Sequence, residues 1–444
     1  MDSSSSNSKK PVVGIVAEYN PFHNGHLRQM TAVRHRLHGA ACVVVLSSNF
    51  TQRGEPGIAD KWTRAQMALC GGADLVLELP FLFACNAAPE FGAGAVDILA
   101  RTKLATHIAF GMEDAHYDTG PILDILIQEP ASFKRVLREK LDKGISYPKA
   151  AGAALEKELP GYGAFLSGPN NSLALSYLLR IARRGYPLIP LPVQRTGAGY
   201  HDLAPGRFSS AAAIRSALQG SPDFRRVEEA MPPSTLRILA ETQRQGRLCS
   251  GAKNLWPLLQ SLLLRSSPED LRRCAGMEEG MEHLFLKRHS AAASYDDFVG
   301  SCVCARYTRS RIQRQIVRLL AGVRRWTAAA VSRSGVPYAR VLGCSEAGRR
   351  LLRQGAKNSE IPILTRLPAI RDPIGKLTAE AEFRASKLYE LLLAEPDARY
   401  EERQRPRFME REDVMERKEV IKGEEVMKGE AGISKPAGES AEER

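Results

Sequence analysis

Short, almost unbroken apolar runs, separated by helical stretches, constrain the fold of this chain more than any other feature of its sequence. Four of them span residues 12–17, 42–46, 75–79 and 107–110. Continuous apolar runs are typical of strands buried on both faces, and strands that alternate with helices indicate an α/β domain. We therefore predict a parallel sheet with helices on both faces. A fifth run, at 188–193, contains two prolines and is predicted to lie at the edge of the sheet.

The same patterns divide the chain into four parts. Residues 1–10 are Ser-rich and form a predicted disordered leader, and residues 11–222 form the predicted α/β domain. Residues 223–394 show helical periodicity and almost no strand signal, so we predict a second, mostly helical domain. Residues 395–444 mix Glu with Lys and Arg and hold few large apolar side chains, which predicts a disordered or partly helical tail.

The charge balance favours a polyanionic partner. The chain carries 63 Lys and Arg against 50 Asp and Glu, a formal net charge of +13. Nucleic acid fits this excess, although a basic protein without such a partner fits it equally well. The eight cysteines include no CxxC pair, so neither a zinc site nor a disulfide framework is predicted. No apolar run reaches about 18 residues and no signal-peptide pattern is present, so we expect no membrane segment and a cytoplasmic location.

The strongest local signal is residues 20–26, Asn-Pro-Phe-His-Asn-Gly-His, between the first predicted strand and the first predicted helix. Parallel sheets bind ligands beyond the carboxyl ends of their strands, and a helix that begins there favours a phosphate. His23 and His26 can donate hydrogen bonds to phosphate oxygens, best when protonated, and Gly25 lets the backbone approach a nucleotide. Two surface histidines in a loop are the alternative. The strand–turn–helix context favours a site that stabilises charge at an attacked α-phosphate.

Nine ordered segments carry a resemblance to a known family. They are residues 16–26, 48–56, 60–64, 72–81, 110–111, 169–171, 200–202, 213–215 and 306–314. On these segments the chain resembles the HxGH nucleotidyltransferase superfamily and, within it, the bacterial tRNA(Met) cytidine acetate ligase family. The resemblance extends over most of the chain. It implies a Rossmann-like nucleotidyltransferase domain followed by a mostly helical, tRNA-binding domain.

The resemblance also implies an activity. Enzymes of this family activate acetate with ATP as acetyl-adenylate, release pyrophosphate, and acetylate N4 of the wobble cytidine of elongator tRNA(Met). ATP is then a substrate, and Mg²⁺ is expected to bridge its phosphate oxygens, held mostly by ATP and water. His23 and His26 would be the catalytic pair. The implied ATP-binding residues are Val16, Ala17, Glu18, Tyr19, Asn20, Pro21, Phe22, His23, Asn24, Gly25, His26, Leu27, Arg28, Gln29, Gly111, Asn170, Asn171 and Arg195.

Basic residues near the next predicted elements are candidate substrate contacts. Arg53 follows the second strand, at the sheet edge that carries the histidines, and Lys61 and Arg64 begin the next helix. All three are predicted to contact ATP phosphates or tRNA. Ordinary solvated charge is an equal alternative for Lys61 and Arg64.

A later helix start, at residues 208–215, resembles the hydroxyl-rich segment with which related nucleotidyltransferases hold phosphates. Ser210 and Arg215 are its predicted substrate contacts, and Ser210 is also a plain N-cap candidate. The chain departs from the family pattern at Ala212, where a hydroxyl is expected, and at Pro89, where an acidic residue is expected.

Seven arginines fall between residues 306 and 325, with Tyr307 and Trp326 beside them. Arg311, Arg314 and Arg318 recur at helical spacing, so they are predicted to share one face. A basic face with aromatic side chains suits the backbone and loops of tRNA, whereas a solvated amphipathic helix is the alternative. Arg311 and Arg314 are therefore the predicted tRNA contacts of the helical domain.

Two other functions remain open from the residues alone. A small-molecule adenylyltransferase of the same superfamily would share the histidine motif, but it would not need the arginine-rich helical domain. A non-catalytic RNA-binding protein could keep a decayed nucleotidyltransferase fold, but the intact pattern His23-x-Gly25-His26 argues against decay.

Overall fold

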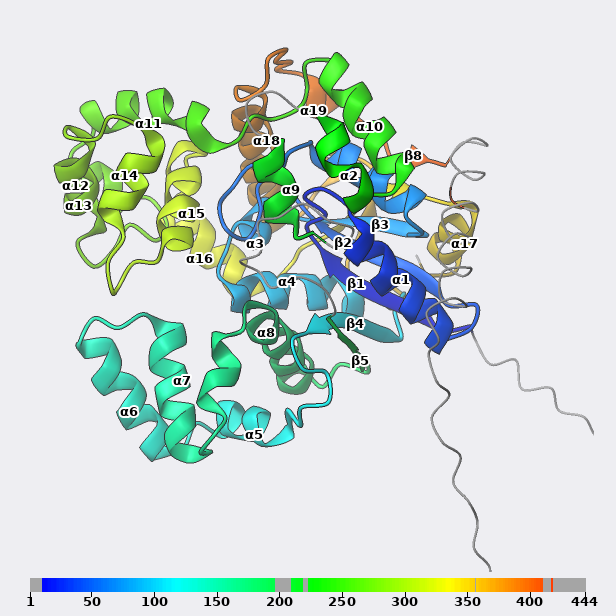
Figure 1. The fold of residues 1–444 in the computed structure, drawn as a ribbon, viewed down its shortest axis with the longest axis horizontal. Coiled ribbons are helices and arrows are strands. Elements are labelled where there is room, and N and C mark those ends of the chain that lie inside the picture. The colour runs from blue at the N-terminus through cyan, green and yellow to red at the C-terminus, as the bar shows by residue number, and fades with distance from the viewer. Residues whose placement is uncertain (1–9, 196–208, 219–222, 356, 410–416, 418–444) are drawn as a thin grey trace, which may run out of the picture.

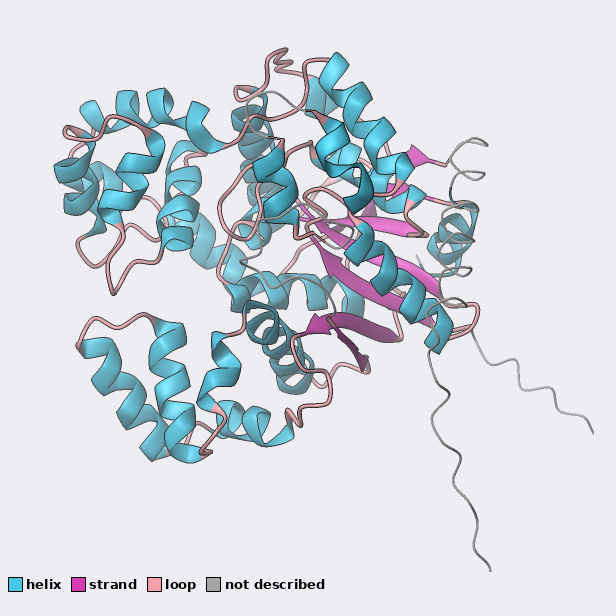
Figure 2. Ribbon diagram, in the orientation of Figure 1, coloured by secondary structure: helices cyan, strands magenta, loops and turns pink. Residues whose placement is uncertain are grey.

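The computed structural model describes residues 10–195, 209–218, 223–355, 357–409 and 417. At its centre lies a single sheet with the strand order β5-β4-β1-β2-β3-β6-β7, and β8 pairs with β6 (Figures 1 and 2). The strands are β1 (Val12–Ala17), β2 (Ala41–Ser47), β3 (Leu75–Leu79), β4 (His107–Met112), β5 (Ile189–Gln194), β6 (Ala339–Cys344), β7 (Ile363–Leu364) and β8 (Arg407–Phe408).

The five strands predicted from the apolar runs form the parallel part of this sheet. β1 pairs in parallel with β2 and β4, β2 with β3, and β4 with β5. The prediction of a parallel sheet is confirmed, and β5 lies at the edge that its two prolines require. Because β2 lies on one side of β1 and β4 on the other, the strand order reverses beside β1. Open α/β sheets bind their ligands at such a switch point, beyond the carboxyl ends of the strands.

Alternate residues of the central strands face opposite helical layers, as the pleat of a strand requires. Val44 of β2 belongs to a buried cluster that includes residues of α1 and α2, and its neighbour Val43 belongs to a second cluster with α4 and α8. The helices of the two layers are α1 (Asn24–Arg36), α2 (Lys61–Cys70), α3 (Phe81–Ala84), α4 (Ala88–Arg101) and α8 (Pro169–Arg184).

Two helical lobes extend from the same side of the sheet, at the left of Figure 1. The lower lobe is inserted between β4 and α8, and the upper lobe follows β5 and α10. No helix in the described part of the chain combines the length and apolar character that a bilayer crossing requires. The remaining helices before β6 are α5 (Gly120–Gln128), α6 (Ala131–Asp142), α7 (Tyr147–Glu158), α9 (Ala211–Ala217), α10 (Pro233–Arg244), α11 (Leu255–Leu264), α12 (Pro268–Arg272), α13 (Met281–His289), α14 (Tyr295–Cys302), α15 (Arg309–Leu320) and α16 (Arg325–Ser334), with short 3-10 turns at Gly163–Ser167, Phe224–Ala230 and Ala252–Asn254.

The region predicted to be a second, helical domain does not stay separate from the sheet. β6 returns to the sheet and pairs antiparallel with β3, and Arg340 lies opposite Glu78 across this pair. Residues 223–394 are therefore not one independent helical unit, which corrects the predicted boundary. The elements that follow β6 are α17 (Glu346–Gly355), a 3-10 turn at Leu367–Ala369, α18 (Pro373–Glu390) and α19 (Tyr400–Arg403).

The charged tail also begins later than the sequence suggests. α19 packs on the core through Glu401, which is buried, and β8 adds to the sheet beside β6. Arg417 pairs with Asp74 at 2.8 Å. The predicted tail start at residue 395 is therefore wrong, because Glu401 finds buried cationic partners that no local pattern shows. The predicted leader at residues 1–9 and most of the tail lie outside the described residues.

Candidate active site

The two histidines of the sequence motif meet at the start of α1, directly after β1. His23 is the N-cap of α1, and its Nδ1 accepts a hydrogen bond from the backbone N–H of Gly25 at 3.0 Å. The backbone N–H of His23 in turn donates to Nδ1 of His26 at 3.3 Å, which closes a capping box. The two rings stack with their centroids 3.7 Å apart and an interplanar angle of 28°. The helix start therefore fixes both rings as one unit.

These hydrogen bonds also determine which nitrogen of each ring carries the proton. A neutral imidazole has one donor and one acceptor nitrogen. Because Nδ1 accepts a backbone hydrogen bond in both rings, the proton of each neutral ring lies on Nε2. Both histidines can then donate one hydrogen bond from Nε2 to an anion.

The site keeps the imidazoles neutral. Burial lowers the pKa of His23 to about 3, and the charges of Arg195 and Arg215 add to this shift. Burial also lowers the pKa of His26, with further contributions from His23 and Arg195. The expectation that this pair binds phosphate best when protonated does not describe the free site, in which the positive charge comes from the arginines.

Aromatic packing holds the histidine loop in place. Tyr19 and Phe22 are buried, and the Tyr19 ring lies edge-on to His26 with centroids 4.7 Å apart. Tyr19 has a φ of +44°, a left-handed backbone conformation that is uncommon for a large side chain. Gly71 is the C-cap of α2, and a Cβ there would overlap the Phe22 ring. The close approach of the end of α2 to Phe22 therefore requires glycine at this position.

Hydrogen bonds tie the loop after β1 to the loop after β2. The Glu18 carboxylate accepts from the backbone N–H of Gln52 at 2.7 Å, and Asn20 Oδ1 accepts from the N–H of Ile58 at 2.7 Å. Burial raises the pKa of the Glu18 carboxyl group, while Arg215, Arg53 and Arg64 oppose the shift. Glu18 thus lies near several positive charges, at the beginning of the predicted ATP-binding stretch.

The structure brings Gly111 and Arg195 to this edge of the sheet. Gly111 lies near the end of β4, and Arg195 directly follows β5, with its N–H donating to the carbonyl of Met112 at 3.0 Å. A Cβ on Gly111 would lie 3.2 Å from Cγ of Arg195, so the absence of a side chain at Gly111 leaves room for the Arg195 side chain. The charge of Arg195 also helps to lower the pKa of both histidines, after the larger effect of burial.

Asn170 and Asn171 lie at the N-terminus of α8, where the sequence analysis missed a partner. The carboxylate of Glu113, just beyond β4, accepts from the backbone N–H groups of Asn170 (3.1 Å) and Asn171 (2.8 Å). Nδ2 of Asn170 also donates to the Glu113 carboxylate, and Oδ1 of Asn171 accepts from the backbone N–H of Glu113. These bonds fix α8 to the end of β4, and a direct nucleotide contact by either asparagine stays a prediction.

Ser210 and Arg215 take different positions on α9. Ser210 is the N-cap, and its hydroxyl accepts from the N–H of Ala213 at 3.2 Å, which is the structural alternative considered above. Arg215 reaches the histidine loop, donating to the carbonyl of Asn20 at 2.8 Å, and it pairs with Glu55 at 3.2 Å. The resemblance segment 200–202 lies outside the described residues.

Lys61 and Arg64 are not substrate contacts, which corrects the sequence prediction. Both side chains are fully buried. Nζ of Lys61 pairs with Glu78, with Glu382 at 2.6 Å and with Glu401 at 2.9 Å. The Arg64 guanidinium donates to backbone carbonyls of the two site loops, those of Glu18, Ser47, Ser48 and Ala59. Lys61 and Arg64 therefore support the two site loops through buried contacts.

The predicted arginine face of α15 is only partly exposed. Arg314 donates to the carbonyl of Gln52 at 3.1 Å, and burial lowers its pKa to about 10. Arg318 donates to the carbonyl of Cys85 at 3.1 Å. Arg311 pairs with Glu279 at 3.2 Å and lies over the Tyr307 ring. All three side chains are partly exposed, so the common face stays a prediction, while Arg314 and Arg318 also attach α15 to loops of the sheet domain.

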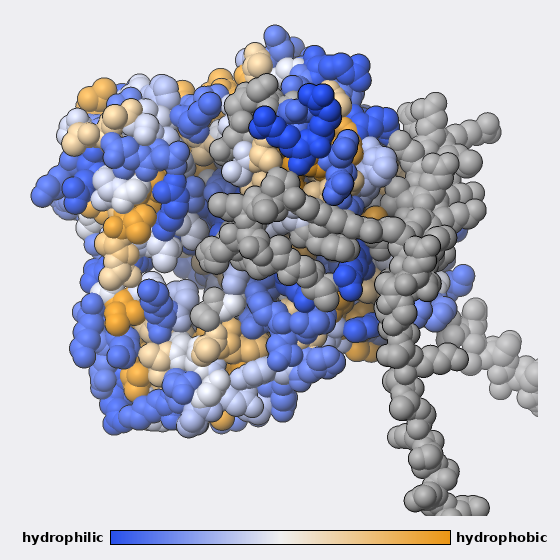
Figure 3. Space-filling view, viewed as in Figure 1, coloured by the Kyte–Doolittle hydropathy of each residue, from blue (hydrophilic) through white to orange (hydrophobic). Residues whose placement is uncertain are grey.

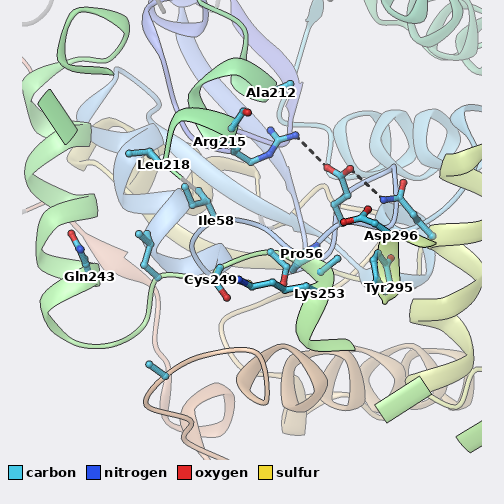
Figure 4. Close-up of a pocket in the computed structure, with 18 of the residues that line it drawn as sticks. Pro56, Ile58, Ala212, Arg215, Leu218, Gln243, Cys249, Lys253, Tyr295 and Asp296 are labelled. Atoms are coloured by element: carbon cyan, nitrogen blue, oxygen red, sulfur yellow. Dashed lines mark hydrogen bonds and ion pairs between the residues drawn. The ribbon is translucent and has the colours of Figure 1, made fainter. Parts of the chain in front are cut away.

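A cavity of about 580 Å³ opens beside the histidine loop, between the sheet domain and the upper helical lobe (Figure 4). Glu55 and Arg215 line it from the sheet domain, and Tyr295 and Gln313 line it from α14 and α15. Sequence reasoning missed this cavity, since its residues come from segments as far apart in the chain as Glu55 and Ala394. Its local signals were Glu55, Arg215 and Gln313, which lie in the resemblance segments 48–56, 213–215 and 306–314.

Metal ligation by the protein alone has little support in the described residues. They contain no group of three or more His, Cys, Asp or Glu side chains arranged to hold a metal ion. Mg²⁺ usually keeps several waters and binds through substrate phosphates with one or two carboxylates. Glu18 and Glu55, the acidic groups of the loops after β1 and β2, would supply such a minor share.

Comparison with known proteins places the chain among related sequences. Residues 10–404 match the family model HIGH Nucleotidyl Transferase. The chain is 36% identical over 402 residues to the tRNA(Met) cytidine acetate ligase of Syntrophomonas wolfei, with 87% of this chain and 96% of that protein covered. It is 37% identical over 398 residues to the protein of the same name from Acetivibrio thermocellus, with the same coverage.

Solved structures give the same picture. The fold is similar to the crystal structure of Thermotoga maritima TmcAL without ligand, with a TM-score of 0.84 and 30% sequence identity. It is also similar to Thermotoga maritima TmcAL bound with alpha-thio ATP, with a TM-score of 0.81 and 30% identity. Each comparison covers 90% of this chain and 99% of that one.

Proposed function

Because the chain belongs to the HIGH Nucleotidyl Transferase family and, within it, to the tRNA(Met) cytidine acetate ligases, we propose that it activates acetate with ATP and acetylates N4 of the wobble cytidine of elongator tRNA(Met). It is an ATP-dependent, tRNA-modifying ligase in this family. The observation that carries the proposal is the stacked, neutral histidine pair at the switch point of the sheet, in a fold that binds an ATP analogue in a relative. A tRNA substrate places the enzyme in the cytoplasm.

In the first step an acetate oxygen attacks the α-phosphorus of ATP and forms a C–O–P bond. The bond from the α-phosphorus to the bridging oxygen breaks, and pyrophosphate leaves with the electron pair. Acetate is a weak nucleophile, so the site contributes mainly by positioning the reactants and stabilising charge. His23 and His26 donate from Nε2 to phosphate oxygens, and Arg195 and Arg215 supply the positive field.

Neutral histidines suit this task physically. Holding a charged imidazole in a buried site before ATP binds would cost several kcal/mol of desolvation energy. A buried neutral donor avoids this cost. The donors are already oriented by the capping box, so little reorganisation accompanies the developing charge. Mg²⁺, carried on ATP, neutralises further phosphate charge when bound.

In the second step N4 of the cytosine attacks the carbonyl carbon of acetyl-adenylate. A C–N bond forms, the C–O bond to AMP breaks, AMP leaves with the electron pair, and one N4 proton is released to water. Acetyl-adenylate is a reactive mixed anhydride, so the site must hold the cytosine amine close to the carbonyl carbon and exclude water that would hydrolyse the intermediate. The buried loops after β1 and β2, joined through Glu18 and Asn20, form the wall that does this.

Acetate-dependent exchange of labelled pyrophosphate into ATP tests the first step. His23→Asn and His26→Asn replace the ring by an amide whose oxygen can still accept the capping hydrogen bond, but they remove the Nε2 donor. We expect each to lower the exchange rate by about 10²–10³ with the fold retained, the loss typical of one oxyanion donor. His35→Asn, on the exposed face of the same helix, is the matched control. Undiminished exchange in both site variants contradicts the assignment.

A further inference from the structure

The cavity between the sheet domain and the upper helical lobe has the properties of a binding site for a single nucleotide. Its volume of about 580 Å³ lies within the range of roughly 300–1,000 Å³ that small-molecule sites occupy. Its walls come from the loop after β2, from α9, from the loop at residues 249–253, and from α14 and α15. The loop after β2, which is hydrogen-bonded to the predicted ATP loop, and the helical lobe therefore contribute to one cavity.

A buried polar group in the wall has no partner. Tyr295 is only 3% exposed, and its hydroxyl makes no hydrogen bond among the described residues. An unsatisfied buried hydroxyl costs about 1–3 kcal/mol, so native structures rarely keep one without a reason. The Glu55 carboxylate is close enough to raise the pKa of the Tyr295 phenol, after the larger effect of burial. A ligand that accepts the phenolic hydrogen would satisfy this group.

Three further polar side chains converge on the same wall. Glu55 pairs with Arg215 at 3.2 Å, and Nε2 of Gln313 lies 3.5 Å from the other Glu55 oxygen (Figure 4). A carboxylate has about four acceptor sites, so these two contacts leave Glu55 able to accept another hydrogen bond. The Glu55 and Arg215 side chains are 32% and 25% exposed, which leaves both accessible to a ligand.

Arg215 links this cavity to the histidine loop. The same guanidinium that pairs with Glu55 donates to the carbonyl of Asn20, three residues before His23. Lys253 and Arg309 line the cavity and are exposed, so they add positive charge where it opens to solvent, although Arg309 also pairs with Asp296. A nucleotide with its base inside and its phosphates at the rim would match this distribution of charge.

We propose that this cavity receives the cytosine base of the nucleotide to be acetylated, with Glu55 accepting a hydrogen bond from its exocyclic amine and Tyr295, Gln313 and Arg215 facing its acceptor atoms. The inference rests on the proposed function for the identity of the base. Cytosine presents one amine donor, N4, and two acceptors, N3 and O2. The wall offers the Glu55 carboxylate as an acceptor together with amide, phenol and guanidinium donors, which is the complementary set, while the second carboxylate of the lining, Asp296, pairs with Arg309.

The same arrangement excludes uracil. Uracil has an oxygen at the position of the cytosine amine and an N–H at N3, so its oxygen would face the Glu55 carboxylate. Two acceptors in contact without a proton between them leave buried polar groups unpaired, and such a mismatch gives strong discrimination. A base must leave its stack to enter a cavity of this kind, as in other enzymes that modify bases.

Tyr295→Phe is the first test, because it removes only the unpartnered hydroxyl. We expect the KM for elongator tRNA(Met) in the acetylation assay to rise about tenfold, the equivalent of one lost hydrogen bond. Acetate-dependent pyrophosphate exchange should keep its wild-type rate, and the melting temperature should not fall. Tyr147→Phe removes a phenol that is 55% exposed on α7 and serves as the matched control.

Glu55→Gln is the second test, because an amide can face either pyrimidine. The probe is a short RNA stem-loop that presents cytosine or uracil at the acetylated position, and the readout is the Kd of the full chain by fluorescence anisotropy. We expect the wild type to prefer cytosine by about tenfold or more, within the range of one good base contact, and the variant to lose most of this preference. Glu241→Gln, whose side chain on α10 is 45% exposed, is the control.

The outcomes separate this inference from the proposed function. A raised KM for tRNA in Tyr295→Phe with intact exchange, together with a lost cytosine preference in Glu55→Gln, supports the cavity assignment. Wild-type KM and wild-type preference in both variants overturn it, even if the enzyme acetylates tRNA. A wild-type protein that forms no N4-acetylcytidine refutes the proposed function instead, and the stem-loop Kd values then still decide whether the cavity selects cytosine.

Discussion

Replacing Lys61 by methionine tests the buried ionic cluster that supports the active site. The cluster joins Lys61 and Arg340 to Glu78, Glu382 and Glu401, and it links α2 and β3 to β6, α18 and α19. All five residues are at most 5% exposed. Lys61→Met keeps most of the side-chain volume but leaves three buried carboxylates with one cation.

The expected loss of stability follows from this imbalance. Removing one partner from a buried ion pair destabilises a protein by about 3–5 kcal/mol, because the other charge stays buried without compensation. Glu78 already resists ionisation, since burial and the neighbouring Glu382 raise its pKa to about 7. At about 2 °C for each kcal/mol in a domain of this size, the melting temperature should fall by about 6–10 °C. The double variant Lys61→Met, Glu78→Gln should recover part of the loss, because it removes one carboxylate charge.

Differential scanning calorimetry at neutral pH measures this effect. Lys134→Met is the control, since Lys134 forms an exposed pair with Glu129 at 3.7 Å and such pairs contribute about 1 kcal/mol or less. Below both melting temperatures, Lys61→Met should keep the KM for ATP of the wild type. A melting temperature equal to that of the control, or a raised KM for ATP at unchanged stability, would refute the structural role and restore the prediction of substrate contact.

Four further outcomes follow from the structure. His23 and His26 should show the neutral Nε2–H tautomer in ¹⁵N NMR with no titration across about pH 5–8, and a midpoint near the ordinary value of 6.5 would contradict their burial. Because burial lowers the pKa of His23 in the folded protein to about 3, the contribution of His23 to stability is complete above pH 6.5 and is lost as the pH falls from about 6.5 to about 3. Urea unfolding at several pH values measures this loss. Gly54→Ala should destabilise the protein by about 2 kcal/mol or more, since the φ of Gly54 is +78° and a Cβ would overlap the backbone of α15. Gly185→Ala, with a φ of +61° and open space around the Cβ, should lose only about 1–2 kcal/mol of stability. Equal losses in thermal melts would argue against the contact between Gly54 and α15. Arg311→Ala should weaken tRNA binding and reduce the slope of log Kd against log salt by about one, without changing pyrophosphate exchange, and an unchanged slope would remove this arginine from the tRNA surface.

The parallel strands and the histidine site could be predicted because their signals are local. β1, β2 and β3 are continuous apolar runs, and the turn after β1 carries its chemistry within seven residues. The topology then places the ends of β1, β4 and β5 together, so Gly111 and Arg195 reach the same edge as the histidines. A local pattern was sufficient for the strands and for the histidine turn, whereas Gly111 and Arg195 were expected only from the resemblance to the family.

The errors share one physical cause, which is pairing across long sequence separations. Lys61 follows a good N-cap, Asp60, and looks like an ordinary surface residue at a helix start, because its partners Glu382 and Glu401 lie more than 300 positions away. β6 contains Arg340 and Gly343, which weaken its strand signal, and only its pairing with β3 buries that arginine. The one local hint was Glu78, a charged residue inside the apolar strand β3.

The same limit applies to the cavity. Glu55, Arg215, Tyr295 and Gln313 come from four segments, and each has an ordinary local role at a turn or on a helix. Their common property, a set of donors and one acceptor around an empty volume, exists only after the helical lobe packs against the loop after β2. A sequence pattern can therefore indicate the phosphate site but not the shape that selects the base.

The most direct test of the account follows the oxygen atoms of acetate. The full chain is incubated with ATP, Mg²⁺, elongator tRNA(Met) and acetate labelled with ¹⁸O in both positions, and mass spectrometry is applied to the AMP and to the tRNA nucleosides. Formation of acetyl-adenylate and its attack by the cytosine amine predict one ¹⁸O in AMP and one in N4-acetylcytidine. Unlabelled AMP, or ADP as the nucleotide product, would contradict adenylation of acetate at the paired histidines.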